Sequence, residues 1–136
     1  MTITHDRFRQ FVALAGITGG LAVVLGAFGA HGLKEHLTPE MLSVFETAVR
    51  YQVYHALAMF AVALLADRTS AHSTRRLFHA SGWSFFVGIV IFCGSLYALS
   101  LTGQKWVGAI TPLGGVALIA GWIFLIWASI RPEKDT

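Results

Sequence analysis

The chain has 136 residues, enough for a single domain, and 55% of them are hydrophobic while only 12% are charged. Soluble domains carry about 25% charged residues, and a small soluble domain has a large surface to cover with polar groups. The composition therefore favours a membrane protein. The formal net charge of +3 does not indicate a nucleic-acid partner, because no basic stripe is interleaved with exposed aromatic residues.

The first apolar stretch covers residues 10–33 and carries no charged side chain, with its histidine counted as neutral. It exceeds the roughly 20 residues that a helix needs to cross the hydrocarbon, and we expect a transmembrane helix over about residues 10–31. A cleaved signal peptide over residues 1–30 is the alternative, with a basic start and small residues at its end. The apolar run is longer than the core of a typical signal peptide, which favours the membrane helix.

The second predicted helix is longer than its uncharged run, residues 51–66, which alone is short for a span. The Thr-Pro-Glu sequence at residues 38–40 is typical of a helix start. Threonine caps the helix, proline fits the first position, and glutamate suits the positive end of the helix dipole. We therefore predict one helix from Pro39 to about Ala66. Its start, about residues 39–46, lies at the membrane interface, and about residues 47–66 cross the membrane.

Two further uncharged stretches, residues 80–104 and 106–130, are each long enough to span a membrane. Pro112 lies near the start of the second, where a helix tolerates proline. We expect the last two helices over about residues 80–101 and 109–130. The predicted fold is all-α: a single domain over residues 1–136, built as an integral membrane bundle of four antiparallel transmembrane helices.

Basic residues are unevenly divided between the two sides of the expected bundle. Seven of the ten lysines and arginines fall in the N-terminal segment, the second loop (with residues 69–76 expected to be solvated) and the tail, and three fall on the other side. Cytoplasmic segments carry the excess of such residues, so we expect both termini in the cytoplasm. The seven are Arg7, Arg9, Arg68, Arg75, Arg76, Arg131 and Lys134; the three are Lys34, Arg50 and Lys105. Aromatic residues mark the expected boundaries, with Trp83 and Trp127 on the inner side and Tyr97 and Trp106 on the outer.

Small residues recur at helical spacing in the predicted spans. Lipid tails are as apolar as leucine, so helices associate through close packing and hydrogen bonds rather than through burial. We therefore interpret the glycines as helix-packing positions rather than ligand sites. The expected partner is the lipid bilayer, with a homo-oligomer or another membrane protein as a further candidate. The candidate packing positions are Gly16, Gly20, Gly26, Gly29, Gly88, Gly115 and Gly121.

Polar side chains gather toward the predicted outer side, and ionisable groups at membrane depth are functional candidates by default. Glu46 and Arg50 are four residues apart, in the favourable order for a helical ion pair. We expect a neutral His55, buried against the first helix near residues 26–31. The complete candidate cluster is His31, Glu46, Arg50, Tyr51, Gln52, Tyr54 and His55.

Three interpretations of this cluster remain open. It is a structural network that fixes helix packing, a proton-linked or small-ligand site that uses histidine, or a metal site. No tight ligand spacing such as HExxH or CxxC supports the metal site, so we assign no metal and no cofactor. No nucleophile elbow, phosphate loop or dinucleotide fingerprint occurs. We therefore assign no catalytic residue and do not expect an enzyme. The metal interpretation would use His31, His36, His55 and Glu46.

Four segments are spread in order over nearly the whole chain: GAFGAHGL at 26–33, YQVYHAL at 51–57, GSLY at 94–97, and TPLGG at 111–115 with Gly121-Trp122. Together they resemble the YgdD/YwdK family of small bacterial inner-membrane proteins, which has a domain of unknown function. The resemblance implies a four-helix protein of the bacterial inner (plasma) membrane, and it implies no reaction. The expected role is structural or accessory. The alternative is a small proton-coupled transporter, or a ligand- or metal-binding membrane protein, that uses the His31/His55 region.

Overall fold

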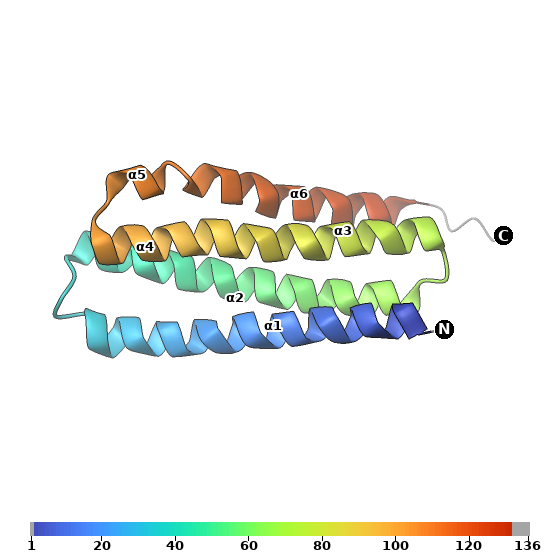
Figure 1. Cartoon of the computed structure of the whole chain (residues 1–136), viewed down its shortest axis with the longest axis horizontal. Coiled ribbons are helices and arrows are strands. Elements are labelled where there is room, and N and C mark those ends of the chain that lie inside the picture. Colours follow the sequence, from blue (N-terminus) through green and yellow to red (C-terminus); the bar gives the residue numbers. More distant parts are fainter. Residues whose placement is uncertain (1, 132–136) are drawn as a thin grey trace.

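The computed structural model describes residues 2–131, with side chains from Asp6 onward, and confirms the predicted all-α fold. The helices lie side by side along one axis, and the two termini lie at the same end (Figure 1). Lys134, which enters the count of basic residues, lies outside the described residues. Four helical stretches are long and apolar enough to cross a membrane: Asp6–Leu33, Pro39–Arg68, His72–Thr102 and Lys105–Ile130.

Three of these stretches are interrupted. Helix α1 (Thr2–Phe28) continues into a wider π-helical turn, η1 (Gly29–Leu33), whereas α2 (Pro39–Arg68) is one regular helix. The third stretch consists of α3 (His72–Gly88), a second π-helical turn, η2 (Ile89–Cys93), and α4 (Gly94–Thr102). The fourth consists of a short helix, α5 (Lys105–Gly108), and α6 (Thr111–Ile130).

The helix ends follow from local chemistry. Helix α2 begins where predicted, and the Thr38 hydroxyl accepts a hydrogen bond from the Met41 amide at 3.2 Å. The prediction of a solvated loop over residues 69–76 is wrong, because α3 already begins at His72. The Arg75 guanidinium donates hydrogen bonds to the Ala66 and Thr69 carbonyls, so the first turn of α3 is held against the last turn of α2.

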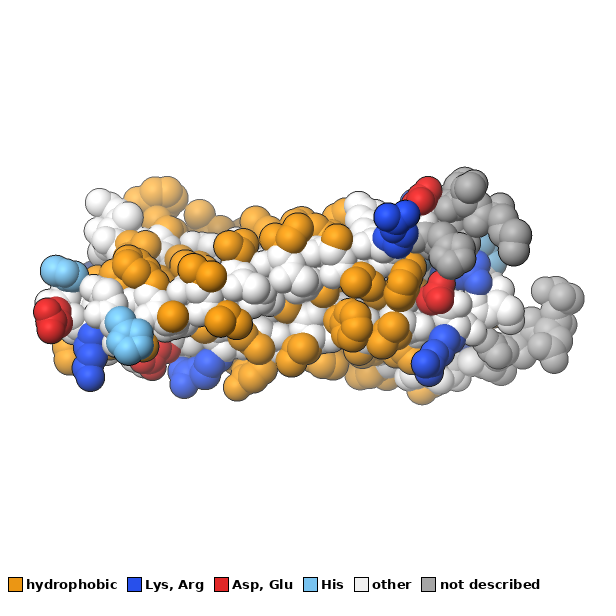
Figure 2. Space-filling model, turned by 90° about the horizontal axis from the view of Figure 1, so that it is seen from below, with side chains coloured by type: hydrophobic (Ala, Val, Ile, Leu, Met, Phe, Trp, Pro, Cys, Tyr) orange, Lys and Arg blue, Asp and Glu red, His pale blue; other side chains and the backbone are white. Residues whose placement is uncertain are grey.

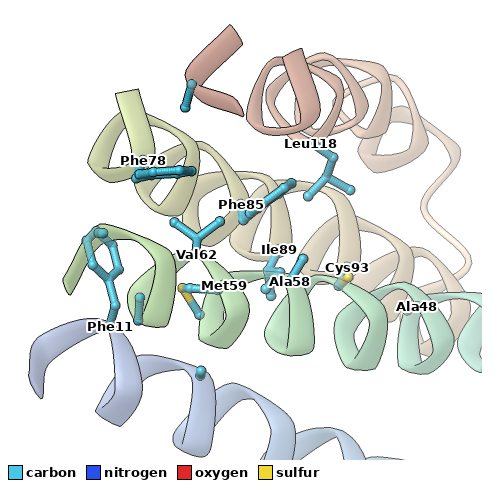
Figure 3. Packing of buried hydrophobic residues seen from close by; sticks show 14 residues of the cluster. Phe11, Ala48, Ala58, Met59, Val62, Phe78, Phe85, Ile89, Cys93 and Leu118 are labelled. Carbon is cyan, nitrogen blue, oxygen red and sulfur yellow. The ribbon is translucent and has the colours of Figure 1, made fainter. Parts of the chain in front are cut away.

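The helices pack in an order that leaves α1 and α6 on opposite sides (Figure 1). Helix α1 packs on α2, α2 packs on α3 and α4, and α3 packs on α6. Phe11, Met59, Phe85 and Leu118 bring side chains from α1, α2, α3 and α6 into one buried cluster (Figure 3). On the face that Figure 2 shows, apolar side chains are spread along the middle of the molecule, and charged side chains gather at its two ends. This surface suits a bilayer.

Three glycines allow the closest contacts, all between the third and fourth stretches. A Cβ on Gly114 would lie 2.3 Å from the Phe92 backbone nitrogen, and one on Gly88 would lie 2.4 Å from the Leu118 side chain. A Cβ on Gly121 would lie 2.5 Å from the Phe85 ring. Any side chain at these positions would push α6 away from α3 and η2.

The other glycines expected to pack fall into two groups. Gly26 and Gly29 of the first stretch lie against α2. A Cβ on Gly26 would be 3.3 Å from the Val49 side chain, and one on Gly29 would be 3.1 Å from the Phe45 ring. A Cβ on Gly115 would make an ordinary contact with the Phe92 ring. Gly16 and Gly20 do not mark an interface within the described chain, because a Cβ at either would meet nothing within 4 Å. The face of α1 that is buried instead carries Ala15, Thr18 and Ala22.

Candidate functional site

Gln52 lies in the middle of the molecule and joins three helical stretches. Its side chain is 4% exposed. The amide nitrogen donates to the Thr18 carbonyl of α1 at 2.7 Å, and the amide oxygen accepts from the Tyr97 hydroxyl of α4 at 2.8 Å. The opposite orientation of the amide would bring its oxygen against a carbonyl, so these two partners determine which way the group points.

His55 lies one turn further along α2, is 6% exposed, and joins this helix to α6. The Trp122 indole N–H donates to His55 Nε2 at 3.2 Å. An indole nitrogen only donates, so Nε2 is an acceptor and the proton of the neutral ring is on Nδ1. Nδ1 in turn donates to the Tyr51 carbonyl at 2.7 Å. The hydrogen bonds therefore hold one neutral tautomer of His55.

Aromatic rings surround His55. The ring centroids of Phe85, Tyr51 and Trp122 lie 5.6, 5.9 and 6.1 Å from that of the imidazole. Phe85 and Trp122 also meet edge to face, with centroids 5.1 Å apart. The three rings and the 6% exposure of His55 show that the histidine is enclosed.

Hydroxyl groups form the side-chain hydrogen bonds that join the described parts of the third and fourth stretches. Ser81 donates to the Gly121 carbonyl at 2.7 Å. Ser95 donates to the Phe92 carbonyl in η2, so the 2.7 Å contact between the Ser95 and Thr111 hydroxyls uses the Thr111 hydrogen. Among the described residues, no buried side-chain nitrogen or oxygen lacks a hydrogen-bond partner. The interior is therefore polar in places and fully paired.

The structure does not bring the predicted cluster together. His31 is exposed in η1, and Tyr54 and Glu46 are exposed on α2. Since Gly29 lies beside Phe45 and α2 runs antiparallel, His31 is level with about residue 44. His55 is eleven residues further along α2, a distance of about 16 Å at 1.5 Å per residue. His31 and His55 therefore belong to different regions of the molecule.

Two expectations about individual residues need correction. His55 is buried as predicted, but its ring faces Phe85 and Trp122 of α3 and α6 rather than residues 26–31 of the first helix. The rotation of α2 decides this, because Ala56 is the residue beside α1 at this level. Arg50 donates to the Thr47 hydroxyl at 3.2 Å, and the described residues contain no ion pair between Arg50 and Glu46.

Comparison with known proteins places the chain among bacterial membrane proteins. Residues 25–115 match the model of the family described as "Protein of unknown function (DUF423)". The chain belongs to this family. It is 49% identical to the UPF0382 membrane protein YwdK of Bacillus subtilis over 123 residues, which are 90% of this chain and 98% of that protein. No solved structure matches the chain.

Two further relatives of the DUF423 chain come from staphylococci. UPF0382 membrane protein SSP2132 of Staphylococcus saprophyticus is 45% identical, and the UPF0382 membrane protein of Staphylococcus epidermidis is 42% identical. Each match covers 123 residues, which are 90% of this chain. The match covers 98% of the Staphylococcus saprophyticus protein and 97% of the Staphylococcus epidermidis protein. The family is uncharacterised, so membership establishes a membrane protein and no biochemical activity.

The DUF423 chain offers no convergent set of metal ligands in its described part. No three histidine, cysteine, aspartate or glutamate side chains come together there. The proposed ligands His31 and His55 are far apart, and His36 is exposed beyond η1. Gln52, in contrast, joins α2 to α1 and α4, and His55 joins α2 to α6, each at a fixed height along α2.

The side-chain partners of Gln52 and His55 are not among the residues that the sequence singles out for this site. Tyr97 is expected in the outer aromatic belt, but its hydroxyl points inward to Gln52. Trp122 has no predicted role, although its indole N–H contacts His55. One signal is available: tyrosine and tryptophan usually place their polar group on a hydrogen-bond partner when they are buried. An aromatic residue far from the end of a predicted span is therefore a candidate partner for a buried polar residue.

Proposed function

We propose that this chain is a structural or accessory protein of the bacterial inner (plasma) membrane, that it is not an enzyme, and that both termini lie in the cytoplasm. The observation that carries the proposal is that Gln52 and His55 each form hydrogen bonds to other helices of the bundle. Each side chain uses both of its polar ends in hydrogen bonds, and Thr18, Tyr97 and Trp122 contribute partners from three other parts of the bundle. Such an arrangement holds helices together.

A transport or ligand-binding role for the His31/His55 region has less support. Both ring nitrogens of His55 are engaged, and three aromatic rings lie around it. A ligand that used Nε2 would first have to displace Trp122. His31 is exposed near one end of the molecule, about 16 Å away along the helix axis.

The proposed location rests on relatives and on charge. The relatives in Bacillus and Staphylococcus are named membrane proteins, and basic residues favour the cytoplasmic side of a membrane. An accessory protein of this kind contacts a second copy or another membrane protein through its lipid-facing helices. Gly16 and Gly20, one turn apart, leave a short part of the exposed face of α1 without side chains, which supports close approach of another helix.

A comparison of two His55 variants with a double variant tests the structural role. His55→Gln retains an acceptor for the Trp122 N–H, so we expect only a small loss of stability. His55→Leu leaves that N–H unpaired, which costs about 1–3 kcal/mol. The double variant His55→Leu/Trp122→Phe removes both partners and should recover part of the loss, by about 0.6–1.7 kcal/mol for a bond between membrane helices. Reversible unfolding in mixed detergent micelles measures all three changes.

Native mass spectrometry of the same proteins in mild detergent completes the test. It reports bound metals and small molecules, and it also distinguishes a second copy of the chain from another membrane protein. We expect the variants to differ from the wild type in stability and not in a bound polar ligand. A metal or small molecule that is present in the wild type and lost from both single variants, with stability unchanged, would contradict the structural proposal.

A further inference from the structure

A basic cavity lies at the end of the molecule that carries both termini. Its volume is about 450 Å³, and it opens between the first turns of α1 and α3. Ligand pockets in proteins are typically ~300–1,000 Å³, so this cavity is large enough for a polar headgroup. The basic side chains that line it are Arg7, His72, Arg75, Arg76 and His79.

Helix geometry explains why these groups converge. The four residues from α3 are spaced at three- and four-residue intervals, so they share one face of its first two turns. Arg7 joins them from α1 because Phe11, one turn further along, is packed against α3. The Phe11 ring lies 5.5 Å from that of Trp83 and 5.9 Å from that of His79, and it fills the space over Gly82.

The positive charge of the cavity is not neutralised within the described part of the chain. Arg75 is committed to the carbonyls at the end of α2. Arg7 and Arg76 make no hydrogen bond or ion pair there, and no carboxylate of a described residue lines the cavity. Arginine stays charged in proteins and presents a planar set of donors that matches phosphate oxygens. The cavity is therefore chemically suited to an anion with several acceptor oxygens.

The remaining wall of the cavity is apolar. Ala80 and Trp83 line it on the side that leads along α3 toward the middle of the molecule. The Trp83 ring is held between Phe11 and Phe86, at 5.5 and 5.9 Å. A ligand that fits both walls has a phosphate next to an apolar chain. An anionic phospholipid has this chemistry, and basic pockets between transmembrane helices bind anionic headgroups.

We propose that this cavity binds the phosphate of an anionic phospholipid headgroup, with Arg7 and Arg76 as its contacts and with the acyl chains following the surface beside Trp83. The proposal does not depend on the role of Gln52 and His55, because it concerns the other end of α3 and a different set of side chains. It also does not depend on which side of the membrane this end occupies.

Lipid binding to the full-length chain in detergent tests the proposal. Native mass spectrometry compares added phosphatidylglycerol with added phosphatidylcholine for the wild type, Arg7→Gln and Arg76→Gln. We expect the wild type to prefer phosphatidylglycerol and each variant to bind it about fivefold more weakly. Arg9→Gln is the matched control: it removes one charge from the same end of α1, but Arg9 does not line the cavity. It should retain the wild-type preference.

Three results would overturn the proposal. Equal weakening by Arg9→Gln would show a general attraction to the basic surface rather than a site. An unchanged preference in both lining variants would show that Arg7 and Arg76 are not the contacts. Displacement of phosphatidylglycerol by inorganic phosphate at the same concentration would assign the cavity to free phosphate rather than to a lipid. Arg75 is left unchanged throughout, since its hydrogen bonds to the end of α2 make it part of the fold.

Discussion

At the scale of single residues, the interior is organised by the direction of hydrogen bonds. Trp122 can only donate, so it requires an acceptor at His55 Nε2. A protonated His55 would offer N–H groups at both positions and would lose this bond. Gln52 faces the same constraint in another form, because a carbonyl on one side and a hydroxyl on the other select one orientation of its amide. The shape of the cavity around them would not by itself determine the tautomer of His55 or the orientation of the Gln52 amide.

Two tyrosines of α2 and α4 allow a matched test of this argument. Tyr97→Phe keeps the ring, which packs on Phe45 with centroids 4.9 Å apart, but leaves the Gln52 oxygen without its donor. We expect unfolding in mixed micelles to show a loss of about 1–2 kcal/mol, since an unpaired buried acceptor is costly. Tyr54 is 56% exposed and makes no hydrogen bond in the described structure, so Tyr54→Phe should change stability little. Equal effects would refute the Gln52–Tyr97 pairing as a source of stability.

At the scale of helices, two of the three tightest contacts of α6 are made by glycines that lie two turns apart. Gly114 meets the backbone of η2 at Phe92, and Gly121 meets the Phe85 ring. Between them Leu118 fills the space over Gly88 of α3. Glycine and leucine thus alternate across this interface, and they bring α6 close enough for Ser81 to reach the Gly121 carbonyl and for Ser95 to reach Thr111. Close packing and hydrogen bonding support each other here.

Single methyl groups test which glycines form interfaces. Gly114→Ala places a Cβ 2.3 Å from a backbone nitrogen, which a side-chain rotation cannot relieve. We expect a loss of about 1–3 kcal/mol, as for other overpacked positions. Gly20→Ala is the control, because nothing lies within 4 Å of its Cβ, and alanine favours a helix by about 1 kcal/mol over glycine. Thermal unfolding in detergent should therefore rank Gly114→Ala below the wild type and Gly20→Ala at or above it. The reverse order would contradict the described packing.

The sequence predicted the helices better than it predicted their faces. Uncharged length and the Thr38 cap were sufficient to place the long second helix, because the cost of polar groups in lipid limits where a span can lie. The rotation of each helix was not predictable in the same way. A lipid-facing surface and a packed surface are both apolar, so the pattern around Gly16 and Gly20 resembled that around Gly114 and Gly121.

The candidate site was predicted in part for the same reason. Gln52 and His55 stood out as polar residues in an apolar run, but the direction of each side chain depends on the rotation of α2. Their partners Tyr97 and Trp122 are 45 and 67 residues away along the chain. The two π-helical turns also have no signature in the sequence, and η2 changes the register of everything that follows it on the third stretch.

At the scale of the whole molecule, the polar groups are separated by role. The paired side chains of Gln52 and His55 are buried. On the face that Figure 2 shows, the charged side chains lie at the two ends of the molecule. The end that carries both termini holds six of the described arginines, including Arg75 and Arg76, whereas Lys34, Arg50 and Lys105 belong to the other end. This asymmetry is the basis for the proposed orientation, because basic segments are retained on the cytoplasmic side.

Single cysteines on exposed serines test that orientation with little change in structure. Ser73 lies in the first turn of α3, at the end with the termini, and Ser43 lies in the early turns of α2, at the opposite end. Both are exposed, and the native Cys93 is 1% exposed, so it should not react in the folded protein. On intact cells, a membrane-impermeant maleimide should label Ser43→Cys and should label Ser73→Cys only after the membrane is permeabilised.

A reporter fused after the last residue, Thr136, should accordingly behave as cytoplasmic, and one inserted near Leu37 as periplasmic or extracellular. The two methods are independent. Labelling reports whether a cysteine of the folded protein is accessible from outside the cell, and the fusion reports the side of the membrane on which the reporter lies. The wild-type chain, which has Cys93 alone, gives the background for the label. If intact cells labelled Ser73→Cys and protected Ser43→Cys, the orientation would be inverted. The basic end of α1 and α3 would then face outward, and charge asymmetry would not be what orients this bundle.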